Sequence, residues 1–197
     1  MKTGTAVTIT VLAGLATTPW LAMGQAITIT APGGGVAAPG ETVTVTMSAS
    51  YGGGDYAIAG LATSLIINQI EGGFSDVRLV APMDGPGTSA GVLSAGSVDG
   101  IISGQLNFPL AGIYADPTNP IAFWEADFTV SDFPSDVVVL DIETRTTRFD
   151  VYVDRGSTLS ESRMDVLTEG SLRIILPAPG STLALLGGLA LTSRRRR

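Results

Sequence analysis

Paired carboxylates are the side chains best placed to do chemistry in this sequence. Glu125 and Asp127 stand two positions apart in an alternating run, so both point to one face of a strand, about 7 Å apart. Two carboxyl groups can act as the acid and base of a glycoside hydrolase. The solvated face of an amphipathic strand explains the same spacing, and we favour that interpretation.

The composition removes most other catalytic chemistry. The 197 residues include no histidine and no cysteine, and the only lysine is Lys2. The chain therefore lacks the commonest general base, thiol nucleophiles, disulfides and the preferred ligands of zinc, copper and iron. We predict that the protein is not an enzyme and binds no cofactor.

Calcium prefers oxygen ligands and is the one metal that such an acidic chain could hold. The best local clusters are Asp116-Pro117-Thr118-Asn119 and the stretch from Asp150 to Asp154. Neither has the alternating acidic spacing and glycine of a calcium loop. We interpret these residues as stabilising turns and predict no metal site.

The charge of the central region limits the choice of partners. The whole chain has a formal charge of −7, but residues 25–176 hold all 18 acidic residues against six arginines, which leaves −12. Nucleic acid is bound through clustered Lys and Arg. We therefore predict no nucleic-acid partner.

The N-terminus has the three parts of a secretion signal. Lys2 precedes an apolar run from Ala6 to Ala16, and the small residues of Ala22-Met23-Gly24 precede Gln25. The run is shorter than the about 20 apolar residues that span a membrane. We predict a signal peptide at 1–24, removed during export by the secretion machinery.

The C-terminus ends in a short apolar segment and an arginine cluster. From Pro179 to Ser193 a helix would measure about 22 Å, against about 30 Å for the hydrocarbon core of a membrane. Clustered arginines favour the cytoplasmic side, which leaves the domain outside. We predict a short hydrophobic helix at 177–197 that holds the protein in the inner membrane at least transiently.

This tail resembles the PEP-CTERM sorting signal, which exosortases process. Ala178 stands where the family has Glu, so either a standard or a variant exosortase could read it. A plain C-terminal membrane anchor is the alternative. The residues that match, or that we assign to the signal, are Pro177, Ala178, Pro179, Gly180, the run Ser181–Leu189, and Arg194, Arg195, Arg196 and Arg197.

Between the two ends, β-type runs recur without helical periodicity. We predict an all-β fold, a single β-sandwich of about nine strands at 25–176. The candidate strands are Ala26–Thr30, Thr42–Ser48, Tyr56–Ile67, Asp76–Val80, Gly100–Leu106, Ile121–Val130, Asp136–Glu143, Arg148–Val153 and Leu172–Leu176.

Because successive side chains of a strand point to opposite faces, the sequence predicts which residues of these strands are buried. Trp124, Ala126, Phe128 and Val130 should be buried, whereas Phe123, Glu125 and Asp127 should lie on the other face. The mixed charges from Glu143 to Asp150 indicate a protected edge strand. The glycine runs at 33–35 and 52–54 are predicted loops without the helix that phosphate binding needs, and Gly85–Ser97 is a predicted loop at one end.

Pro39-Gly40-Glu41 entering the Thr42–Thr46 strand, and the aromatic strand from Phe123 to Val130, resemble a cohesin-type or carbohydrate-binding-module-type sandwich. We predict an exported cell-surface or extracellular-matrix protein with a structural or adhesive role. The alternative is a surface module that binds a protein, as the cohesin resemblance implies, or an extracellular polysaccharide. A coplanar exposed row of Tyr51, Tyr56 and Tyr152 would favour polysaccharide.

Overall fold

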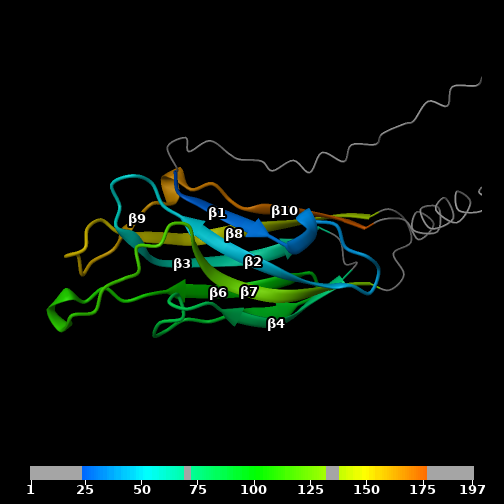
Figure 1. Ribbon diagram of the computed structural model, residues 1–197, viewed down its shortest axis with the longest axis horizontal. Helices are drawn as coiled ribbons and strands as arrows, with labels where there is room; N and C mark the ends of the chain where they lie inside the picture. Colours follow the sequence, from blue (N-terminus) through cyan, green and yellow to red (C-terminus); the bar gives the residue numbers. More distant parts are fainter. Residues whose placement is uncertain (1–23, 69–71, 132–137, 177–197) are drawn as a thin grey trace, which may run out of the picture.

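Ten strands form two antiparallel sheets that pack face to face in the described part of the computed structural model, residues 24–68, 72–131 and 138–176 (Figure 1). The predicted all-β sandwich is confirmed. The smaller sheet has the strand order β1 (Ala26–Thr30), β2 (Thr42–Ser50), β7 (Ile121–Val130) and β4 (Gly72–Leu79).

The larger sheet is also antiparallel. Its order is β10 (Ser171–Leu176), β8 (Val138–Tyr152), β3 (Ala57–Ile67), β6 (Ser97–Gly104) and β5 (Val92–Ser94), with β9 (Glu161–Ser162) paired to β8. Three short 3-10 turns are η1 (Pro32–Gly34), η2 (Pro109–Ala111) and η3 (Met164–Val166). Within the described residues, no helix has the length and hydrophobicity needed to cross a membrane.

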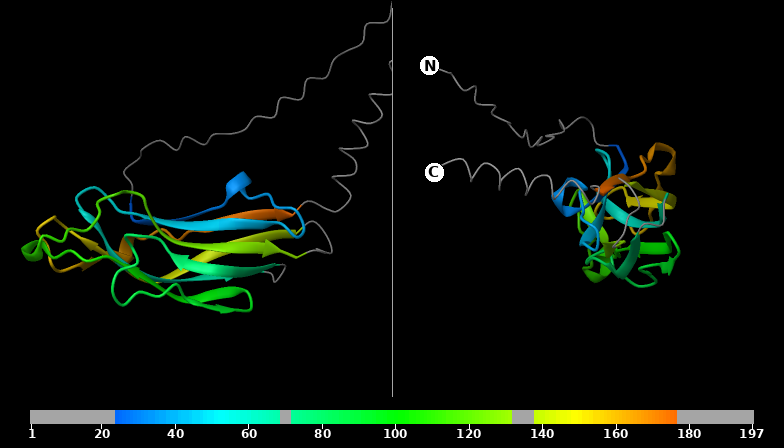
Figure 2. Two further views of the ribbon diagram at one scale, coloured as in Figure 1. Left: turned by 60° about the horizontal axis from the view of Figure 1, so that its bottom comes forward. Right: turned by 90° about the vertical axis from the view of Figure 1, so that its right-hand side faces the viewer.

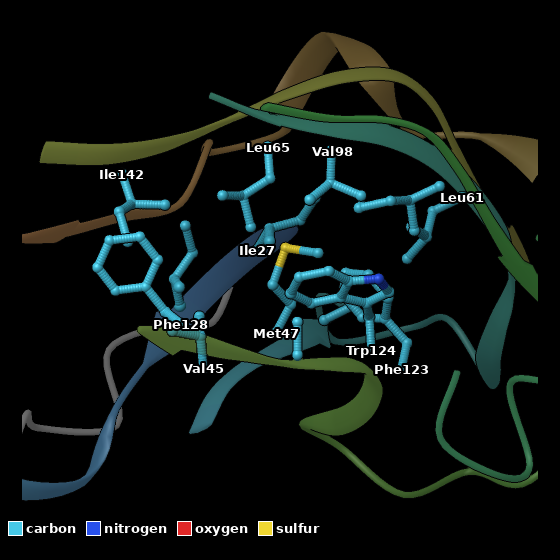
Figure 3. Packing of buried hydrophobic residues seen from close by; sticks show 14 of the residues in the cluster. Ile27, Val45, Met47, Leu61, Leu65, Val98, Phe123, Trp124, Phe128 and Ile142 are labelled. Carbon is cyan, nitrogen blue, oxygen red and sulfur yellow. The ribbon is translucent and has the colours of Figure 1, made fainter. Parts of the chain in front are cut away.

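The core lies between the sheets, where inward side chains of both meet (Figure 3). The predicted buried face of β7 is confirmed, because Trp124, Ala126 and Phe128 are completely covered and Val130 nearly so. Facing them from the larger sheet are Leu61, Leu65, Val98 and Ile142.

A bulge corrects one predicted face. Met47 of β2 pairs with Trp124 but Ser48 pairs with Ala122, so Phe123 is an extra residue without a partner on β2. The bulge interrupts the alternation of β7, and Phe123 is fully buried beside Trp124. The prediction that Phe123 shares the polar face of Glu125 is therefore wrong.

Strand β8 corrects a second prediction. β3 pairs along one side of it, and on the other side β10 pairs up to Glu143 and β9 pairs from Asp150. The strand is therefore interior to the sheet, and among the described residues no strand pairs with residues 144–149 on that second side. The register of β3 and β8 shifts at Thr147, which has no partner. That shift reverses the alternation and explains why one long strand looks like two separate runs in the sequence.

The segment 85–97 also differs from the predicted end loop. It contains β5, and Ser89 exchanges two backbone hydrogen bonds with Ile102, at 2.7 and 2.9 Å. The segment therefore lies along β6 as an extension of the larger sheet.

Two other loops gather at one end of the sandwich. Residues 105–116 and 153–160 lie side by side there, and β10 ends at the opposite end (Figure 2). The end of β10 at Leu176 is therefore far from these two loops.

Candidate protein-binding groove

The carboxylates of β7 share the outer face of the smaller sheet, as predicted, but both are engaged by neighbours. Glu125 accepts a 3.0 Å hydrogen bond from Arg78 of β4. Asp127 accepts a 3.0 Å bond from the hydroxyl of Thr44 on β2. These cross-strand pairs stabilise the sheet, which fits the interpretation of a polar strand face.

The acidic clusters considered for calcium form turns. One Asp116 oxygen accepts hydrogen bonds from the hydroxyl and then the backbone N–H of Thr118, and these bonds, the hydroxyl's first, lower the pKa of Asp116. Asp154 accepts a 2.7 Å bond from the backbone of Gly156, while Asp150 pairs with an arginine of its own strand. The turn interpretation of Asp116 and Asp154 is confirmed, and the described residues contain no group of three or more acidic side chains suited to a metal ion.

Tyr51 is buried, with 7% of its surface exposed. Its hydroxyl lies 2.7 Å from the carbonyl oxygens of Tyr56 and Pro117, either of which can accept its proton. The side chain of Asn119 bonds both the N–H and the carbonyl of Tyr51. Tyr51 therefore fixes loops and offers no surface for stacking a sugar.

The other two tyrosines have a similar role. The hydroxyl of Tyr152 donates to the carbonyl of Gln105 and accepts the backbone N–H of Asn107. The hydroxyl of Tyr56 donates to the carbonyl of Ala115. Since Tyr152 is also only 7% exposed, these rings do not form the exposed row that would favour a polysaccharide ligand.

A groove of about 220 Å³ lies on the outer face of the larger sheet. Loop 85–88 forms one side, and its floor is the paired backbone of β3 and β6 at Gly60 and Gly104. A Cβ on Gly104 would lie 3.0 Å from the carbonyl oxygen of Ala59, and one on Gly85 would lie 2.8 Å from the carbonyl of Gly104. Glycine is therefore required where loop 85–88 approaches β6 so closely.

Polar and apolar groups both line the groove. Arg148 projects from β8 and pairs with the nearly buried carboxylate of Asp150. The hydroxyl of Thr88 donates to the carbonyl of Gly85 at 2.6 Å, and Ile102 is 42% exposed. Mixed lining of this kind suits a peptide segment, because it offers both apolar contact and orienting polar groups.

A second hollow of about 270 Å³ adjoins the groove at the end of the sandwich. The two share Gly85, Pro86, Gln105 and Leu106, and the second is also lined by Ile113 and Tyr114. Along β8 the same outer face carries the exposed Glu143 and Arg145. The groove is thus the hollowed end of a longer polar surface.

Sequence reasoning missed this groove. The charge alternation of β8 included Arg148, but it was assigned to an edge. The signal for the loop, Gly85-Pro86-Gly87, indicates a turn without indicating where it packs. The predicted sorting residues Pro177, Ala178, Pro179, Gly180 and Arg194–Arg197 lie outside the described residues, as does the predicted signal peptide up to residue 23.

Comparison with known proteins shows the fold. No family model matches the sequence, and no curated protein matches it. Among solved structures, a chain of the Coh-OlpC–Doc435 type I cohesin–dockerin complex from Clostridium thermocellum is similar, with a TM-score of 0.53 and 14% identity over 80% of this chain and 97% of that chain.

Two cohesins from Acetivibrio cellulolyticus give the same result. The sixth cohesin of scaffoldin B, in complex with the Cel5 dockerin, has a TM-score of 0.52 and 11% identity over 78% of this chain and 99% of its own. The third cohesin of ScaC, in complex with the ScaB dockerin, has a TM-score of 0.52 and 14% identity over 77% and 99%. At such identities the likeness concerns the fold alone: this chain is a cohesin-like two-sheet β-sandwich.

Proposed function

We propose that the sandwich is a protein-binding module that docks its partner on the outer face of the larger sheet, at the groove beside Arg148. The observation that carries this proposal is a groove of about 220 Å³ with mixed lining, on a fold whose similar solved structures were determined in complex with dockerins. On this proposal the protein acts by binding, without a cofactor and without catalysis.

The partner should offer an apolar residue to Ile102 and an acidic group to Arg148, on a surface that is otherwise basic. Ile102 supplies apolar contact in the groove, and the region 25–176 carries a charge of −12 from 18 acidic residues and six arginines. Complementary charge accelerates association and excludes wrong partners. Binding should therefore weaken as the salt concentration rises.

Photo-crosslinking in the native host tests this proposal. A photoreactive amino acid replaces Ile102 in the groove or, as the control, Thr129, which is exposed on the outer face of the smaller sheet. We expect a protein adduct of one defined mass from position 102 only, reduced by Arg148→Glu in a variant that retains its circular dichroism. The same adducts from both positions, or none, would contradict the proposal, and a polysaccharide adduct would favour the alternative ligand.

We also propose that the module works at the cell surface or in the extracellular matrix, in adhesion or structure. The sequence supports this through the predicted signal at 1–24 and the PEP-CTERM-like tail, which would bring it to an exosortase-like enzyme at the inner membrane. Intact mass of the mature protein, with and without that enzyme, tests the route. A mass ending near Pro177–Gly180 only when the enzyme is present is expected, whereas an end at Arg197 in both strains would indicate a permanent membrane anchor.

A further inference from the structure

An apolar tip projects from the end of the sandwich where loops 105–116 and 153–160 meet. Five large apolar side chains within nine residues are exposed, and Leu159 of the second loop is 82% exposed. Single exposed apolar residues are common, but a cluster of this kind indicates an interaction site. Its members in the first loop are Leu106 (52%), Phe108 (48%), Leu110 (90%), Ile113 (46%) and Tyr114 (45%).

Two buried polar side chains hold the first loop so that its apolar residues stay exposed. Gln105 and Asn107 are 8% and 4% exposed, and they alternate with the exposed Leu106 and Phe108. Gln105 donates to the carbonyl of Ile58 at 2.8 Å. A loop that buries its amides and exposes its leucine and phenylalanine is the reverse of ordinary burial, and it needs a reason other than folding.

The apolar tip is also preorganised. Phe108 and Ile113 exchange two backbone hydrogen bonds, at 2.8 and 3.2 Å. The turn between them closes through a 2.9 Å bond from Gly112 to Pro109, and Gly112 has a φ of 73°, which favours glycine. Since the loop already holds one conformation, little ordering entropy opposes binding.

We propose that the occupant of the apolar tip is the apolar tip of a second copy of this chain, in a two-fold arrangement. The tip carries both signs of charge. The guanidinium of Arg155 lies 4.2 Å from the centre of the Tyr114 ring, and Asp154 precedes Arg155 in the sequence. Asp116 lines the second hollow together with Tyr114. In a two-fold contact each arginine can meet an acidic residue of the other copy.

The exposed area fits a weak dimer. Added together, the exposed fractions of these six side chains correspond to between three and four complete large side chains. At about 150–250 Å² for each side chain, the exposed apolar surface is roughly 600 Å² per copy. Two copies would bury about 1,200 Å² in total, the low end of specific interfaces. Because β10 ends at the opposite end of the sandwich (Figure 2), the dimer would place the two β10 ends far apart, at its two outer ends.

Cysteine trapping tests the self-association, because the chain has no cysteine of its own. Leu110→Cys places a thiol on the apolar tip of the full chain, and Thr30→Cys places the control thiol on the smaller sheet, at an exposed position on β1. Both purified proteins are oxidised in the same detergent and compared on non-reducing gels. We expect Leu110→Cys to form disulfide dimers at least about tenfold faster.

Second variants separate the outcomes. In the Leu110→Cys background, adding Phe108→Ser and Ile113→Ser should lower the dimer yield about tenfold with unchanged circular dichroism. Arg148→Glu in the groove should leave the yield unchanged, which keeps this test independent of the proposed partner. Equal rates for the two thiols, or an unchanged dimer yield in the serine variant, would overturn the proposal.

Discussion

The side-chain amide of Asn107 donates a 2.6 Å hydrogen bond to the carbonyl oxygen of Ser157, and this bond joins the two loops of the apolar tip. The same amide donates to the carbonyl of Arg155 at 3.2 Å, and its oxygen accepts the backbone N–H of Ala115 at 3.0 Å. Asn107 therefore uses its side-chain oxygen and nitrogen to hold one end of the molecule together.

Asn107→Ala should destabilise the protein by about 2 kcal/mol, because it leaves the buried N–H of Ala115 and the carbonyl of Ser157 without their partner. Urea unfolding followed by circular dichroism measures the loss. Asn68→Ala is the matched control, since Asn68 also makes two hydrogen bonds to Asp141 but is exposed. Equal losses would show that the amide of Asn107 is not a structural anchor.

Phe123→Ala should cost about 3–5 kcal/mol, the usual loss for a fully buried phenylalanine. Simple alternation places Phe123 on the polar face with Glu125, where truncation would cost little. The bulge opposite Met47 and Ser48 places it in the core instead. Thr129→Ala, at an exposed position of the same strand, is the control and should change the free energy of unfolding by less than about 0.5 kcal/mol.

Much of the sandwich is predictable because its strands alternate locally. The bounds Ala26–Thr30 and Ile121–Val130 match β1 and β7, and the buried face of β7 follows from a period of two. The order of the strands within each sheet is harder to predict from the sequence. Nothing in the charged run from Glu143 to Asp150 shows that β3 pairs along one side of it, with β10 and β9 at its two ends on the other.

Bulges and loop positions explain the remaining errors. An extra residue such as Phe123 or Thr147 reverses the faces that follow it, and the pairing partner that defines it is distant in sequence. The groove depends on loop 85–88 lying against Gly104, and the apolar tip depends on Gln105 and Asn107 turning inward. Those are tertiary contacts, which a local pattern does not contain.

Tyr51 should make the protein sensitive to alkali. Burial, followed by the charges of Tyr56, Asp116 and Asp55, raises the pKa of Tyr51. The folded protein then keeps a phenol proton that the unfolded chain releases. Its contribution to stability is complete below the unfolded pKa of about 10 and is lost as the pH rises through the folded pKa.

The free energy of unfolding should therefore fall above about pH 10, with a contribution of up to about 1.4 kcal/mol per pH unit from Tyr51. Urea titrations between neutral and alkaline pH measure this slope. Tyr51→Phe should remove that part of the slope while lowering stability at neutral pH through the lost hydroxyl bond. Tyr114→Phe, at a ring that is 45% exposed, should retain the slope. An unchanged slope in Tyr51→Phe would exclude Tyr51 as its source.

The ion pair of Asp55 with Arg163 ties η3 and its neighbouring strand to the start of β3. The guanidinium lies 3.0 Å from a carboxylate whose side chain is only 9% exposed, and Gln25 donates a further 3.1 Å bond to it. Arg163→Met should cost about 3 kcal/mol, because it leaves Asp55 charged and nearly buried without its cation.

A double-mutant cycle distinguishes that cause from lost packing. If the stranded charge of Asp55 is responsible, adding Asp55→Asn to Arg163→Met should recover about 1–2 kcal/mol, since a neutral amide costs less to bury than an unpaired carboxylate. Arg173→Met, which breaks the exposed pair with Asp141, should cause a clearly smaller loss. If Arg163→Met and the double variant were equally unstable, the contribution of Arg163 would come from packing of its side chain and not from its charge.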